Sequence, residues 1–238
     1  MQKKRVKEDK RSERKESLLS SKTNSAGSER NVKLKTFRIM GLLLSLLIFT
    51  FSLAGQGRQR GIHASVGYAW PRQDNLGSAL ASSLGLDFQL RRNWRLVLDF
   101  SYARYPVNFD PQGLMEGTLV STPFWIRLQY NFFPGPISPY LGGGVGYVFN
   151  RFQMEGMVTI PEVTISQKVD DNWGFIVGVG AEWRLRGEQV TVFGEANYLT
   201  CSPPGVTSIN DMNFGRREER FSVDLNSWQL RLGIRYFY

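Results

Sequence analysis

Apolar and polar residues alternate with a period of two through most of the chain beyond residue 60, and this feature constrains the fold more than any other. Successive side chains of a strand point to opposite faces, so the period is typical of strands that separate two environments. The pattern predicts an all-β fold with eight strands. They cover approximately residues 61–70, 83–90, 94–105, 119–132, 139–150, 172–185, 189–199 and 222–238.

One face of these strands is apolar apart from two glycines, and the other face carries charges near the strand centres. A soluble sandwich would also alternate, with its apolar side chains inward. Three features favour an outward apolar face instead: the charges near the strand centres, the aromatic residues at strand ends, and the alternation of short and long connections along the chain. An outward apolar band around a polar interior is typical of a transmembrane barrel. We therefore predict an eight-stranded antiparallel up-and-down transmembrane β-barrel.

The charged side chains of the polar face are predicted to meet inside this barrel. An eight-stranded barrel is just wide enough for side chains to fill, and an unpaired buried charge costs several kcal/mol. We interpret the set as a plug of ion pairs, and a narrow polar pore is the alternative. The predicted network consists of Asp87, Arg95, Asp99, Arg127, Glu182, Arg184, Glu195, Arg231 and Arg235.

Connection lengths predict the orientation. Three connections are short, whereas residues 71–82, 106–118, 151–171 and 200–221 form long ones. Transmembrane barrels have short periplasmic turns and long extracellular loops, so both termini are expected in the periplasm and four loops outside. Two aromatic belts are expected at the membrane interfaces. Members include Trp94 and Tyr130 at the periplasmic end, and Tyr102 and Trp228 at the outer end.

The N-terminal region differs from the rest. Residues 1–54 carry +8 of the net charge of +9, so the body is nearly neutral, and nucleic acid is not an expected partner. Residues 1–38 are predicted to be a basic disordered leader with a mis-assigned start, translation beginning near Val32. Residues 39–54 resemble a signal-peptide hydrophobic region with cleavage after Ala54, since its apolar run is shorter than the roughly 20 residues of a spanning helix. An inner-membrane anchor is the alternative, and residues 55–238 form the predicted barrel.

Metal and cofactor chemistry has few candidate residues. The chain has one cysteine, Cys201, and one histidine, His63, which argues against disulfide frameworks and against multi-cysteine or multi-histidine metal sites. No cofactor, metal site or catalytic residue is predicted. His63 and Ser65 lie on one side of a strand, but no acidic residue is evident to orient the histidine, so we interpret both as ordinary polar lumen residues.

Three stretches resemble a known family. The last strand ends in Tyr238 with apolar or aromatic residues at alternate positions before it, like the terminal signal of bacterial outer-membrane barrels. Pro139–Tyr147 and Gly174–Glu182 look like the "PYxGxGxG" and "GxGxE" strands of small outer-membrane barrels similar to outer membrane proteins A, X and W. The resemblance implies recognition by the barrel assembly machinery. The signal residues are Leu230, Leu232, Ile234, Tyr236 and Tyr238.

These features predict a multi-pass protein of the outer membrane, in contact with membrane lipid and lipopolysaccharide. Its expected role is structural or surface-interacting, through the four loops, with a ligand that the sequence does not identify. A pore for small solutes or hydrophobic compounds is the alternative, and a lipid-modifying enzyme using the His63–Ser65 pair is a remote one. Gly142, Gly144 and Gly146 are expected to line the lumen and make room for side chains from the opposite wall, such as Arg231 or Trp125.

Overall fold

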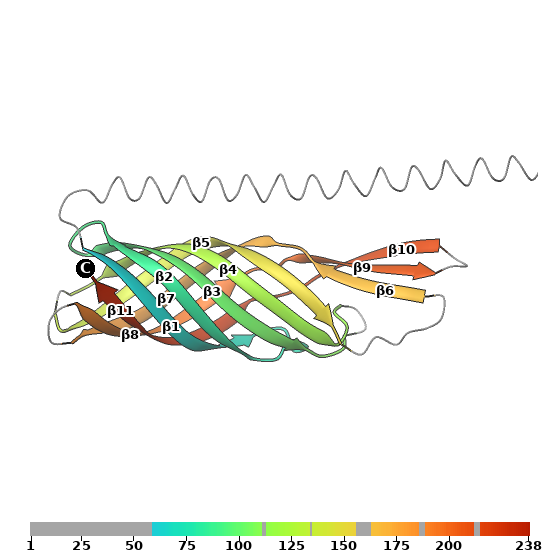
Figure 1. Cartoon of the computed structure of the whole chain (residues 1–238), viewed down its shortest axis with the longest axis horizontal. Coiled ribbons are helices and arrows are strands. Elements are labelled where there is room, and N and C mark those ends of the chain that lie inside the picture. The colour runs from blue at the N-terminus through green and yellow to red at the C-terminus, as the bar shows by residue number, and fades with distance from the viewer. Residues whose placement is uncertain (1–58, 111–112, 134, 156–162, 186–188, 212–214) are drawn as a thin grey trace, which may run out of the picture. The chain divides into compact units, whose positions relative to one another are not determined.

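The computed structural model describes residues 59–110, 113–133, 135–155, 163–185, 189–211 and 215–238. Eight strands form a closed antiparallel barrel in the order β1-β11-β8-β7-β5-β4-β3-β2 (Figure 1). The predicted eight-stranded up-and-down barrel is thereby confirmed. The barrel strands are β1 (Arg60–Pro71), β2 (Ala79–Gln89), β3 (Trp94–Val107), β4 (Gly117–Asn131), β5 (Ile137–Met154), β7 (Asn172–Arg184), β8 (Val190–Thr200) and β11 (Ser227–Phe237).

Closure depends on the pairing of the first and last strands. β1 pairs with β11 along eleven residues, from Gly61↔Phe237 to Pro71↔Ser227. Every barrel strand therefore has two hydrogen-bonded neighbours, which hydrocarbon demands because it offers no partner for a free strand edge. Several strands are longer than predicted: β2 begins at Ala79 and β5 continues to Met154.

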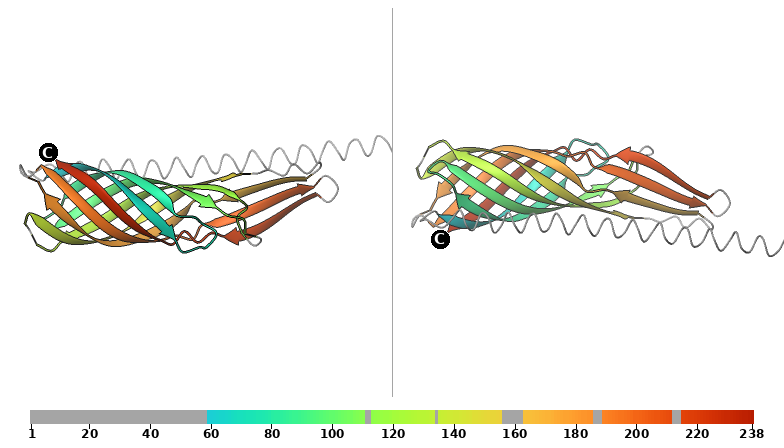
Figure 2. Two further views of the ribbon diagram at one scale, coloured as in Figure 1. Left: turned by 90° about the horizontal axis from the view of Figure 1, so that it is seen from below. Right: turned by 90° about the horizontal axis from the view of Figure 1, so that it is seen from above.

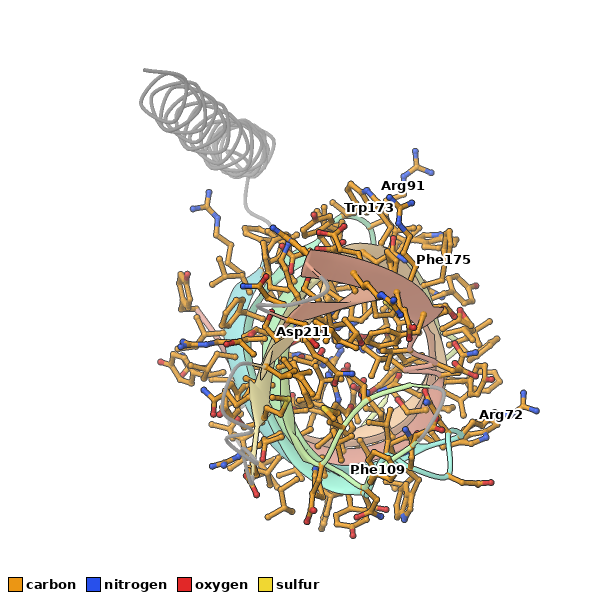
Figure 3. The ribbon with its side chains drawn as sticks, turned by 90° about the vertical axis from the view of Figure 1, so that its right-hand side faces the viewer. Arg72, Arg91, Phe109, Trp173, Phe175 and Asp211 are labelled. Atoms are coloured by element: carbon orange, nitrogen blue, oxygen red, sulfur yellow. The ribbon has the colours of Figure 1, made fainter. Side chains whose placement is uncertain are left out.

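The two faces separate as the alternation predicts. Outward residues are exposed, including Val66 at 67% and all five residues of the terminal signal, whereas Asp87 and Arg235 of the inner face are 0% exposed. Viewed along the barrel axis, inward side chains fill the interior, and Trp173 and Phe175 point outward (Figure 3). The outward apolar face is suited to contact with the lipid tails of a bilayer and not with water.

Two of the long connections contain strands that the sequence did not predict. β6 (Val163–Val169), β9 (Pro204–Asp211) and β10 (Gly215–Ser222) form a separate sheet in the order β10-β9-β6. This sheet continues beyond the loop end of the barrel (Figures 1 and 2). The prediction of one strand over residues 222–238 was wrong at its start, since Ser222 ends β10 and β11 begins at Ser227.

The short connections and the described chain ends lie together at the turn end of the barrel. Arg60 and Tyr238 exchange backbone hydrogen bonds there. Aromatic pairs mark both ends, with ring centroids 4.9 Å apart for Trp94–Tyr130 at the turn end and 4.9 Å for Tyr198–Trp228 at the loop end. The leader, the signal peptide and the Ala54 cleavage site lie outside the described residues. Among the residues described, no helix has the length and hydropathy to cross a membrane.

Candidate functional site in the barrel lumen

The first group of ion pairs lies toward the turn end and centres on Glu182 of β7. Its carboxylate accepts hydrogen bonds from Arg95 of β3 and from Arg235 of β11. Arg235 also contacts Asp87 of β2, with 3.0 Å between Nε and Oδ1. These four side chains come from four strands and are almost wholly buried, so each charge depends on the others for compensation.

A second group occupies the middle of the lumen around Asp99 and Glu195. Arg231 Nη1 donates to Asp99 Oδ2 at 2.8 Å. Arg127 Nη1 donates to Glu195 Oε1 at 3.1 Å, and Arg127 Nη2 lies 3.5 Å from Asp99. Both arginines therefore contact Asp99, and the two groups together pair four acids with four arginines.

His63 of β1 links the two groups. Its Nδ1 lies 2.7 Å from Asp87 Oδ2, and its Nε2 lies 3.6 Å from Asp99 Oδ1. The sequence did not assign His63 to the network, because no acid to orient it was evident. This interpretation was wrong, since Asp87 and Asp99 reach His63 from other strands. The imidazole stands over Gly85, where a Cβ atom would lie 2.3 Å from its Cε1.

Arg184 is the one predicted member that the structure does not bring into the network. It is partly buried near the turn end and forms no ion pair with the other described residues. Neutral side chains do join, although they were not predicted. Gln129 donates to Glu182 at 2.8 Å, and Tyr140 and Asn197 donate to Glu195 at 3.1 and 2.8 Å.

Aromatic rings on the inner face contact arginines of the network. Arg95 lies over Phe237, with 5.1 Å from Cζ to the ring centroid, and Arg235 lies over Phe193 at 4.7 Å. A guanidinium above an aromatic face gains roughly 0.5 to 2 kcal/mol. These two exceptions to the polar inner face therefore support the ionic network.

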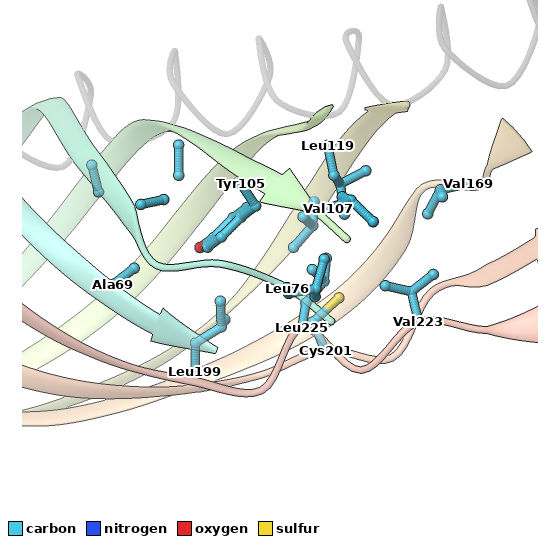
Figure 4. Close-up of a cluster of buried hydrophobic side chains, with 14 of the residues drawn as sticks. Ala69, Leu76, Tyr105, Val107, Leu119, Val169, Leu199, Cys201, Val223 and Leu225 are labelled. Atoms are coloured by element: carbon cyan, nitrogen blue, oxygen red, sulfur yellow. The ribbon is translucent and has the colours of Figure 1, made fainter. Parts of the chain in front are cut away.

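The loop end of the lumen is apolar, contrary to the expectation of a mostly polar and charged interior. Side chains from the loop-end parts of the strands and from the connections form one buried cluster (Figure 4). Leu76, Leu114 and Val223 come from connections, where no period-two pattern indicates burial. The cluster consists of Ala69, Leu76, Ala79, Ala81, Ala103, Tyr105, Val107, Leu114, Leu119, Trp125, Val148, Val169, Ile176, Leu199, Cys201, Val223 and Leu225.

Cys201 belongs to this apolar cluster. It follows the last residue of β8, is a free thiol and is 4% exposed. Burial raises the pKa of the Cys201 thiol to about 11, with a smaller contribution from the charge of Asp224. The thiolate form is therefore scarce at neutral pH, and Cys201 acts in packing like a small apolar residue.

The glycines of β5 and β7 make room for neighbouring side chains. A Cβ at Gly146 would lie 2.2 Å from the Trp125 ring, and a Cβ at Gly180 would lie 2.4 Å from the Tyr140 ring. Trp125 pairs directly with Gly146 across β4 and β5. Trp125 occupies this space as expected, but it comes from the adjacent strand β4, so the expectation of side chains from the opposite wall was wrong.

The His63–Ser65 pair lacks the geometry of an activated nucleophile. The Ser65 hydroxyl shares a 2.7 Å hydrogen bond with the Ser83 hydroxyl, while the imidazole is directed to Asp87. Nucleophilic catalysis needs the serine and its base within hydrogen-bond reach. Within the part of the chain that the structure describes, no group of three or more His, Cys, Asp or Glu side chains is arranged to hold a metal ion.

Comparisons with known proteins agree with this architecture. The model of the family "outer membrane protein beta-barrel domain" matches residues 40–236. The crystal structure of the outer membrane protein OprG from Pseudomonas aeruginosa is similar, with a TM-score of 0.63 and 18% identity, covering 78% of this chain and 98% of that one. A major outer membrane protein from Thermus thermophilus has a TM-score of 0.50 and 16% identity, over 77% and 100% of the two chains. No curated protein is significantly similar in sequence.

Proposed function

The chain belongs to the outer membrane protein beta-barrel domain family, and from this premise we propose that it is an integral outer-membrane barrel with a non-conducting lumen. Its role is structural or surface-interacting, exercised through the structure that the long connections build at the loop end. The observation that carries the proposal is that side chains fill the lumen in two layers. The ionic network fills the part toward the turn end, and the apolar cluster fills the part toward the loop end.

The proposal predicts the absence of stable openings when the purified barrel is inserted in a planar bilayer. Water and ions would have to displace four paired arginines and then cross an apolar layer, and both steps are unfavourable. Single-channel recording at about 1 M KCl measures this directly, with a known porin as the positive control. Regular openings whose ion selectivity changes in Arg127→Glu would contradict the proposal and support the polar-pore alternative.

The orientation is part of the proposal, with the loop end outside and both termini in the periplasm. The outward signal residues of β11 support recognition of this strand by the barrel assembly machinery in the periplasm. We expect the variant Asn210→Cys, on the exposed part of β9, to react in intact cells with a membrane-impermeant maleimide. Buried Cys201 supplies the unreactive background in the parent protein. Labelling only after the outer membrane is permeabilised would reverse the orientation.

A second candidate function is passage of small hydrophobic compounds, and the apolar cluster at the loop end favours it. A hydrophobic solute could enter that layer, whereas the ionic network below would stop it and divert it sideways. The two candidates differ in proteoliposomes. Uptake of a hydrophobic fluorescent probe above the rate of protein-free liposomes supports this second candidate, and equal rates support the structural role.

A further inference from the structure

Arg104 on β3 and Arg151 on β5 stand on the outward face of the barrel near its loop end, and both are exposed. In the strand register Arg104 pairs with Val120 of β4, and Val120 pairs with Arg151. The three residues therefore form one row across three strands. Neighbouring strands lie about 4.8 Å apart, so the two arginines flank Val120 about 10 Å from each other. Both side chains are long enough to meet above it.

The row lies one step beyond the outer aromatic belt. Tyr102 of this belt lies two residues before Arg104 on β3. Phe149 lies two residues before Arg151 on β5, on the same outward face. Between the two belts, the outward positions of the described barrel strands carry no charged residue. The arginines thus stand at the level where hydrocarbon gives way to headgroups.

Among the described residues, neither Arg104 nor Arg151 forms an ion pair. Two carboxylates at the same end have other donors. Glu155 accepts from the Thr118 hydroxyl at 2.9 Å, and Asp171 accepts from the Asn150 backbone N–H at 2.9 Å. Within the described part of the chain, both guanidinium groups are therefore available to an external anion.

We propose that Arg104 and Arg151 together bind a phosphate group of the glycolipid in the outer leaflet. The proposal rests on the proposed orientation, which places the row in that leaflet. Guanidinium forks match phosphate oxygens with two parallel hydrogen bonds, and two forks on either side of one valine suit a single phosphate. The aromatic and apolar face directly below the row offers contact to acyl chains, which a free phosphate ion lacks and a phosphorylated glycolipid has.

Binding of phosphorylated lipid A to the purified barrel in zwitterionic detergent tests the proposal, with affinity measured by fluorescence anisotropy of labelled lipid. Loss of each arginine should weaken binding roughly tenfold, since a hydrogen bond to a charged group contributes about 1.5 kcal/mol or more. We expect this in Arg104→Gln and Arg151→Gln, and a larger loss in the double variant. Arg72→Gln is the matched control, because it removes one exposed charge of the same barrel end outside the row.

Two further ligands identify the source of the phosphate. Lipid A from which the phosphates have been removed keeps the acyl chains and should bind the parent protein as weakly as phosphorylated lipid A binds the double variant. Competition by millimolar inorganic phosphate, or equal affinity for phosphatidylglycerol, would overturn a glycolipid site. Equal binding of phosphorylated lipid A by the parent and the double variant would overturn the role of the arginines.

This experiment is independent of the proposed function. Lipid binding in detergent depends neither on orientation nor on conductance, so those proposals fail or stand by maleimide labelling and by single-channel recording. Both arginines are exposed and outside the ionic network, so the double variant is expected to fold. Retention of heat-modifiable mobility in gel electrophoresis checks that it does.

Discussion

Arg235→Leu is expected to lower the free energy of unfolding of the barrel by about 3–5 kcal/mol, the cost typical of leaving a buried charge without its partner. Arg235 is 0% exposed and contacts both Asp87 and Glu182, so its loss leaves two carboxylates short of positive charge. It also removes the cation–π contact with Phe193. Urea titration in phospholipid vesicles, followed by tryptophan fluorescence, measures the change.

Arg184→Leu is the matched control on the neighbouring part of the lumen. Arg184, like Arg235, lies on the inward face of its strand, but it is only partly buried. It forms no ion pair with the other described residues. We expect a change within about 0.5 kcal/mol. Equal destabilisation by the two leucine variants would contradict the assignment of Arg235 to a compensating role, because burial of any arginine would then suffice.

Gly146→Ala is expected to destabilise the barrel by about 2–3 kcal/mol, near the upper end of what overpacking costs. The new Cβ would lie 2.2 Å from the Trp125 ring and 2.5 Å from the backbone oxygen of Phe124. Trp125 is fully buried in the apolar cluster, and the backbone oxygen belongs to a paired strand, so neither can move away freely. The same urea titration measures this loss.

Gly142→Ala separates close packing from a general intolerance of side chains in β5. A Cβ at Gly142 would have its nearest neighbours at 3.6 and 3.9 Å, which is ordinary contact. We expect no loss of stability and a slight gain, because alanine has less backbone freedom to lose than glycine when a strand forms. A loss equal to that of Gly146→Ala would show that the ring of Trp125 is not the reason for glycine at position 146.

The barrel could be predicted from the sequence because one local rule, the alternation of faces, decides it. Residues such as Val66 and Asp87 reveal their face by position alone. The pairing of charges was less accessible. Arg95 bonds to Glu182, 87 residues away, and this partnership depends on strand tilt and on closure, which no local pattern encodes. The sequence therefore predicts which charged residues face the lumen, but not which of them form ion pairs with one another.

Three parts of the lumen and its loop end were missed for related reasons. His63 was interpreted as unsupported because its acids belong to other strands. The apolar cluster was missed because residues such as Leu114 belong to connections without periodicity. In the loop sheet, the alternation of β6 through Val163, Ile165 and Val169 is interrupted by the polar Gln167, and β10 is charged on both faces and resembles solvated coil.

The ionic network also fixes the alignment of the strands. A slip of one residue in any pairing turns every side chain of the shifted strand to the other surface. For β11 this would place Arg231 and Arg235 among lipid tails, at about 2–4 kcal/mol for each near the bilayer midplane, and it would strand Asp87 and Asp99 inside. A shifted register is therefore destabilised both by arginines in lipid and by unpaired buried acids, so the ionic network favours a single strand register in the closed barrel.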